Sequence, residues 1–128
     1  MQDQPHPHEI VAAVAEFLRA ESHSTFQLRV AGNALDIARR QLELSPAADA
    51  AELARLAALL DRGGALADLN RELAQAIASG AMDLSTPGLA AHLRETTLAK
   101  LAVDQPTYSG YRAALRILRQ AHPSTSSG

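Results

Sequence analysis

The chain has 128 residues, a formal net charge of −2 and no cysteine, and 47% of its residues are hydrophobic although only 3% are aromatic. This length suits one compact domain, the lack of cysteine excludes disulfides and thiolate metal sites, and the near-neutral charge argues against nonspecific nucleic-acid binding as the main task. No run reaches the roughly 18 apolar residues that a membrane span needs, and no secretory signal opens the chain. We therefore expect a soluble, cytoplasmic protein that makes no membrane contact.

The hydrophobic residues favour helices over strands. Alanine and leucine supply most of them, whereas valine and isoleucine occur four times each. Alanine and leucine lose little side-chain freedom in a helix, while strands favour β-branched and aromatic residues. The composition thus predicts an all-α protein, a compact bundle of five to six short helices with a central second helix.

The first predicted helix begins at Pro7 and carries one apolar stripe, and residues 1–6 are expected to fray. A second helix, capped by Ser24 or Thr25, is expected to run to about Leu44. Its apolar arc spans about 200°, wider than the ~100° stripe of a surface helix, so we expect a central helix contacted on two sides. One face holds Phe26, Val30, Ile37 and Leu44, and the other holds Leu28, Leu35 and Leu42, with Ala31 and Ala38 beside them.

Turn residues divide the rest of the chain. Ser45-Pro46 is expected to end the second helix, and Gly63-Gly64 to end the third by supplying left-handed backbone. Pro87 fits the first turn of the fifth helix. A single domain is predicted over residues 1–123 and a disordered tail over residues 124–128. The helices after the second are predicted over residues 49–60, 65–79, 87–103 and 108–121.

Three segments together resemble a family of small helical bacterial proteins classed as a domain of unknown function. They are RVAGNALDIARRQLEL at residues 29–44, LADLNRELAQAIASGAMDL at 66–84 and HLRETTLAKLAVDQPTYSGY at 92–111. The stretch from residue 100 to 111 is the most specific of them. Members of that family tend to be encoded beside aminoglycoside-phosphotransferase-like kinases and acyl-CoA dehydrogenases. The resemblance implies a helical fold and a kinase-like partner, and it supplies no catalytic residues.

The standard catalytic signatures are missing from the sequence. It has no phosphate-binding loop, no H-E-x-x-H and no G-x-S-x-G. His92 and Glu95 have the spacing of a bundle metal pair in reversed order and without a second pair, so a surface histidine beside an acid is the favoured interpretation. We expect no catalytic residue, no metal and no cofactor.

The best candidate site surrounds the turn between the last two helices. Lys100, the only lysine, falls on an apolar face, where it could act as a base or anion anchor. The favoured alternative is a packed stem whose ammonium reaches solvent or Asp104. Tyr108 and Tyr111 are expected to anchor the last helix, with ligand stacking as the other possibility. Backbone N–H groups at the start of that helix could bind an anion.

Two further polar features each have two interpretations. Arg29, Asn33, Asp36 and Arg40 form the polar arc of the second helix, which is a solvated face with an Asp36–Arg40 pair or the lining of a cleft. Asn33 borders the apolar arc and is a candidate for a hydrogen bond to another helix. A basic stripe on the last helix is interpreted as a solvated, dipole-stabilising feature or as a surface for an acidic partner; it consists of Arg112, Arg116 and Arg119.

These observations support an accessory or interaction protein without catalytic activity, partnering a phosphotransferase-like kinase. The alternative is a small-molecule-binding or enzymatic domain with its site at Lys100, Asp104, Tyr108 and Asn33. A helix-turn-helix regulator is disfavoured, because the reading helix over residues 65–79 would present net negative charge to phosphate. A homodimer is also predicted, burying leucines of the helices at 49–60 and 65–79.

Overall fold

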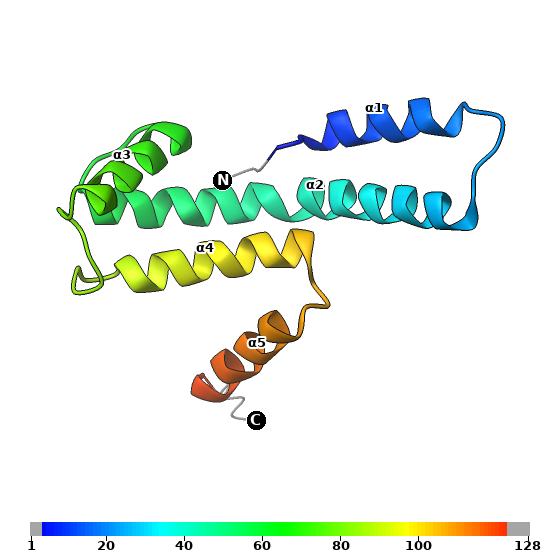
Figure 1. Cartoon of the computed structure of the whole chain (residues 1–128). Coiled ribbons are helices and arrows are strands. Elements are labelled where there is room, and N and C mark those ends of the chain that lie inside the picture. The colour runs from blue at the N-terminus through cyan, green and yellow to red at the C-terminus, as the bar shows by residue number, and fades with distance from the viewer. Residues whose placement is uncertain (1–3, 123–128) are drawn as a thin grey trace, which may run out of the picture.

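The computed structural model describes residues 4–122, and within them the chain forms five helices and no strand (Figure 1). The all-α prediction is therefore confirmed. No helix in this range combines the length and the apolarity that crossing a bilayer requires. The tail predicted over residues 124–128 lies outside the described residues. The helices are α1 (Pro7–Leu18), α2 (Thr25–Leu60), α3 (Leu66–Ala78), α4 (Leu89–Asp104) and α5 (Ser109–Ala121).

The predicted break at Ser45-Pro46 is wrong, because α2 continues through both residues for 36 residues in all. Proline removes one intrahelical hydrogen bond and crowds the carbonyl four residues earlier, which normally bends or ends a helix. Here Pro46 lies on the exposed side of α2, whereas Gln41 and Ser45, which precede it, are buried. Packing of this buried side against α4 holds the two halves of α2 together.

Helix ends also differ from the sequence-based expectation. Ser24 caps α2 as predicted, and its hydroxyl accepts a hydrogen bond of 3.1 Å from the Gln27 N–H. The left-handed residue at the other end is Asp61, with φ of 51°, and not Gly63 or Gly64. Helix α4 begins at Leu89 after a left-handed Gly88, and therefore two residues later than Pro87.

Helix α2 is central, as predicted, because α1, α3 and α4 each pack against it while α5 contacts only α4. The main core lies at one end, where α2, α3 and the start of α4 meet. It consists of Leu56, Leu69, Leu73 and Leu89, with Leu59, Leu60, Leu66 and Met82 around it. Of the leucines predicted to form the homodimer contact, Leu56, Leu69 and Leu73 are buried in the chain's own core and are not exposed to a second copy.

Toward its N-terminal end α2 pairs with α1, and we call this two-helix hairpin, residues 7–44, the arm (Figure 1). The residues buried between its helices are small: Pro7 and Val14 of α1, and Ala31 and Ala38 of α2. The large apolar residues of α2 remain outside: 73% of Phe26 and 64% of Leu42 are exposed. The expectation that α2 buries both large apolar faces is thus wrong for the arm.

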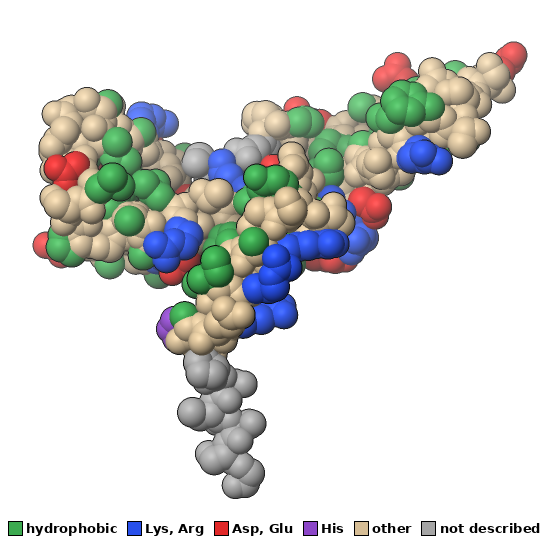
Figure 2. Space-filling model, turned by 60° about the horizontal axis from the view of Figure 1, so that its bottom comes forward, with side chains coloured by type: hydrophobic (Ala, Val, Ile, Leu, Met, Phe, Trp, Pro, Cys, Tyr) green, Lys and Arg blue, Asp and Glu red, His purple; other side chains and the backbone are tan. Residues whose placement is uncertain are grey.

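Helix α5 leaves the body of the protein at an angle and has no buried residue (Figure 1). Tyr111 is half-buried, but Tyr108 is half-exposed, so only one of the two tyrosines is positioned to anchor this helix. Figure 2 shows arginine side chains gathered along one side of α5. Those of this helix are Arg112, Arg116 and Arg119, all exposed, and no acid within residues 4–122 pairs with them.

Candidate functional site

The turn between α4 and α5 folds against the arm side of α2 and borders an open pocket of about 500 Å³, which we call the corner pocket. Helix α4 ends at Asp104, and the turn closes with a 3.0 Å hydrogen bond from the Tyr108 N–H to the Gln105 carbonyl. Three of the five predicted site residues, Asn33, Asp104 and Tyr108, line this pocket. The other lining residues are Asp36, Ile37, Arg40, Gln105, Pro106 and Thr107.

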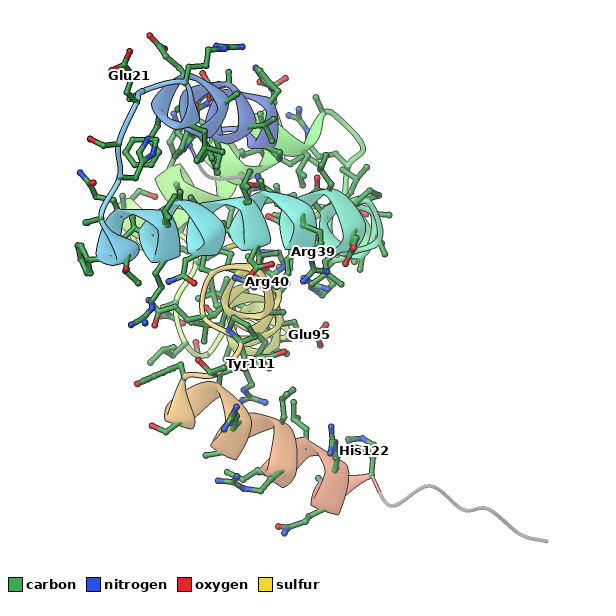
Figure 3. The ribbon with its side chains drawn as sticks, turned by 90° about the vertical axis from the view of Figure 1, so that its right-hand side faces the viewer. Glu21, Arg39, Arg40, Glu95, Tyr111 and His122 are labelled. Atoms are coloured by element: carbon green, nitrogen blue, oxygen red, sulfur yellow. The ribbon has the colours of Figure 1, made fainter. Side chains whose placement is uncertain are left out.

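Arg40 connects the corner pocket to the end of α4. Its Nε donates a 2.6 Å hydrogen bond to the Val103 carbonyl, one of the last acceptors of α4 (Figure 3). An arginine at this end also suits the negative end of the helix dipole. The predicted Asp36–Arg40 pair is wrong, because Asp36 lies 3.7 Å from Arg39 instead. Three of the four residues of the polar arc, Asn33, Asp36 and Arg40, thus line the corner pocket, whereas Arg29 does not.

Lys100 lies one turn before Asp104 and faces α2, not the corner pocket. It lines a narrow slot of about 40 Å³ between α2 and α4, a volume that suits a few water molecules. Gln41 and Ser45 form the opposite wall, and Asp104 borders both cavities. The lysine is half-buried, consistent with a packed stem. The slot and the corner pocket are thus neighbours that share one carboxylate.

The position of the Tyr108 ring depends on the glycine two residues later. The ring lies so close to Gly110 that a Cβ there would approach the ring to 2.7 Å. Gly110 therefore allows the Tyr108 ring to fold back over the start of α5. Tyr111 lines neither cavity, and lies at the end of α5 nearest to α4 (Figure 3). The five predicted site residues thus lie in three places: the corner pocket, the slot of Lys100 and the start of α5.

A polar cluster around the buried His92, between α2 and α4, was not predicted from the sequence. Arg55 donates to His92 Nδ1 at 3.4 Å, to Glu95 at 3.0 Å and to Thr96 at 3.3 Å. His92 is only 2% exposed, so its interpretation as a surface histidine is wrong. Burial, and then the positive charge of Arg55, lower the pKa of His92 below its usual value of 6.5. His92 is thus held neutral, with Nδ1 as a hydrogen-bond acceptor.

A second part of this cluster joins α2 to α3. Asn70 donates a 2.8 Å hydrogen bond to Glu52, which is buried on α2. Among the described residues, no group of three or more histidine, aspartate or glutamate side chains is arranged to hold a metal ion. The spacing of His92 and Glu95 was visible in the sequence, but Arg55 is 37 residues away from His92 and only the pairing of α2 with α4 brings them together.

Comparison with protein families adds one finding to this geometry. A family model described as a domain of unknown function, DUF6285, matches residues 18–108. The chain belongs to the DUF6285 family. Comparison with curated proteins and with solved structures gives no significant match.

The DUF6285 region contains α2, α3, α4 and the turn that follows. It therefore includes the corner pocket, the slot of Lys100 and the polar cluster of Arg55 and His92. Most of α1 and all of α5 lie outside it. Both polar cavities between α2 and α4 thus belong to the part of the chain that defines the family.

Proposed function

We propose that this DUF6285 protein is a bacterial, cytoplasmic accessory protein without catalytic activity, which binds a phosphotransferase-like kinase. The observation that carries the proposal is an apolar groove along one side of the arm. The resemblance of residues 29–44, 66–84 and 92–111 to proteins encoded near such kinases supports the choice of partner.

The groove runs between α1 and α2 and has a volume of about 280 Å³. Its walls are almost wholly apolar, with Phe17 from α1 and Phe26 and Val30 from α2 as the largest side chains. Exposed apolar surface of this kind marks interaction sites, and a groove between two helices fits the apolar face of a partner helix. We propose that a helix of the kinase occupies it.

Binding measurements with matched variants test this proposal. The chain is co-expressed with a phosphotransferase-like kinase of the same genome, and the affinity of the complex is measured by isothermal titration calorimetry. Phe26→Glu places a charge in the groove and should weaken binding at least tenfold, whereas Leu84→Glu, at a loop residue that is 84% exposed, should leave it unchanged. Absence of a complex, or equal affinity of the wild type and Phe26→Glu, contradicts the proposal.

A small-molecule function is the second candidate, favoured by the corner pocket. Asn33, Arg40, Asp104 and Tyr108 bring an amide, a guanidinium, a carboxylate and a phenol to one cavity large enough for a metabolite. Native mass spectrometry of the purified protein tests it: a bound adduct in the wild type that is lost in Tyr108→Ala supports this function. A wild-type spectrum without any adduct contradicts it.

A DNA-binding role has less support. Asp68 on α3 pairs with Arg71 at 2.8 Å, and Glu72 pairs with Arg62 at 3.0 Å, so these arginines already neutralise acids. The would-be reading helix offers no basic surface to phosphate. A homodimer, by contrast, is compatible with the proposal, because the groove occupies only one of the two apolar sides of the arm.

A further inference from the structure

We propose that two copies of this chain associate through the side of the arm opposite the groove. This side, the leucine seam, consists of Val11 and Leu18 of α1 and Leu28, Leu35 and Leu42 of α2. The inference goes beyond the proposed kinase partner, since it names a different surface and a different occupant.

Helical geometry separates the seam from the groove. On α2, the buried Ala31 and Ala38 face α1. At 100° per residue, Phe26 and Val30 fall on one flank of this alanine row, whereas the three leucines fall on the other. On α1, Ala13 and Phe17 line the groove, while Val11 and Leu18 point to the opposite flank. Leu42 lines a surface hollow with Pro7 and His8, which places it beside the start of α1.

The seam is uncovered in the single chain. All five of its side chains are exposed, from 38% for Leu35 to 64% for Leu42. Neither α3, α4 nor α5 contacts α1, and α4 meets the arm at Arg40, on the other side of α2 from the leucines, so no element within residues 4–122 covers this flank of the arm. A two-helix hairpin has no third layer of its own, and apolar surface on this scale is characteristic of an interface.

The spacing along α2 favours a second copy as the occupant. Leu28, Leu35 and Leu42 are seven residues apart, which is the repeat that keeps one seam facing a partner helix. A two-fold axis at Leu35 sets Leu28 of each chain opposite Leu42 of the other, so the seam matches its own copy in antiparallel orientation. In a two-fold interface both chains use the same patch, and two hairpins joined in this way form a four-helix arrangement.

The charges beside the seam are compatible with self-association. Asp36, Arg39 and Glu43 follow the leucines along α2, with Arg39 2.9 Å from Glu43 and 3.7 Å from Asp36. Arg39 pairs with both acids within its own chain, so these three residues leave a net charge of only −1 per copy beside the seam. A strongly acidic or basic partner would find no complementary field on this flank.

Sedimentation velocity of the full chain tests the association. The wild type should sediment as a dimer at micromolar concentration, and Leu42→Glu should raise the dissociation constant at least tenfold. Ile117→Glu on α5 is the matched control, because Ile117 is also 64% exposed, and it should leave the dimer intact. Circular dichroism checks that both variants remain helical. A monomeric wild type, or a dimer unaffected by Leu42→Glu, overturns the proposal.

Cross-linking tests the antiparallel register, since the chain contains no cysteine of its own. Leu35→Cys lies on the proposed axis and should form a disulfide dimer upon oxidation. Leu28→Cys and Leu42→Cys should cross-link when mixed with each other but not alone. Cross-linking of Leu28→Cys with itself instead would overturn this register. The proposed kinase binding does not depend on this dimer. A chain that is monomeric but still binds the kinase would reject the dimer and leave the proposed function standing.

Discussion

Replacing Pro46 by alanine should stabilise the protein, and this change decides whether α2 is one helix. A proline inside a helix costs about 3 kcal/mol relative to alanine, through the lost hydrogen bond and the crowded carbonyl. Pro46 is exposed, so the substitution removes little packing. Loss of the ring also frees the unfolded chain, which opposes the gain by about 1 kcal/mol. The net expectation is an increase of about 2 kcal/mol in the free energy of unfolding.

The measurement is urea denaturation followed by circular dichroism at 222 nm, with thermal melting alongside. At roughly 4 °C per kcal/mol for a chain of this size, the gain corresponds to a rise of about 8 °C in the melting temperature. Pro87→Ala is the control: this proline lies in the turn before α4, so its replacement should leave the stability unchanged or lower it by up to about 1 kcal/mol.

The two interpretations of Pro46 differ in the sign of the effect. If Ser45-Pro46 separated two helices, proline would occupy a first turn, where its missing N–H costs nothing. Alanine would then be neutral or destabilising. Unchanged or reduced stability of Pro46→Ala would therefore refute the continuous helix, and with it the single rod that joins the arm to the core.

Three further predictions follow from burial and contacts. Leu56→Ala, at a fully buried core position, should lower the free energy of unfolding by roughly 2–5 kcal/mol. Leu35→Ala in the monomeric chain should lower it by less than about 1.5 kcal/mol, because Leu35 is exposed there. Equal losses in urea denaturation would contradict the exposed seam. Gly110→Ala should displace the Tyr108 ring and alter tyrosine fluorescence while changing the stability by no more than about 1 kcal/mol, and an unchanged spectrum would count against the packed ring. Because the pKa of His92 is lower in the folded than in the unfolded chain, the unfolded state binds more protons below pH 6.5, and stability should fall as the pH decreases from 7.5 to 5.5. This dependence should weaken in His92→Gln, and an equal slope in both proteins would show that other groups cause it.

Local sequence signals predicted most helices but not that α2 continues through Pro46. The Ser24 cap and the helical apolar spacing identified α1, the start of α2, α3 and α5. Pro46 is an equally strong local signal for a helix end. The helix continues nevertheless, because Gln41 and Ser45 pack against α4, which lies far away in the sequence. Long-range packing of this kind is not encoded in any single window of the sequence.

The candidate site was predicted where its residues are close in sequence. Asp104 and Tyr108 flank one turn, so their meeting at the corner pocket follows from the chain itself, and Asn33 was singled out by its border position on α2. The direction of Lys100 toward the slot depends on which face of α4 meets α2. The cluster of Arg55 and His92 depends on the same pairing, and only His92 carried any signal beforehand.

The one-sided placement of the core has a consequence for dynamics and for evolution. All four fully packed leucines lie beyond Pro46, while the arm is joined by alanines and one valine. At 1.5 Å per residue, α2 is about 54 Å long, and only its C-terminal part lies in the leucine core, so we expect its two ends to open as separate cooperative units. Amide protons of the arm should therefore exchange through local opening, well before those around Leu56 and Leu69. Substitutions in the arm can change what it binds without lowering the stability of the core, so recognition and folding are free to vary independently.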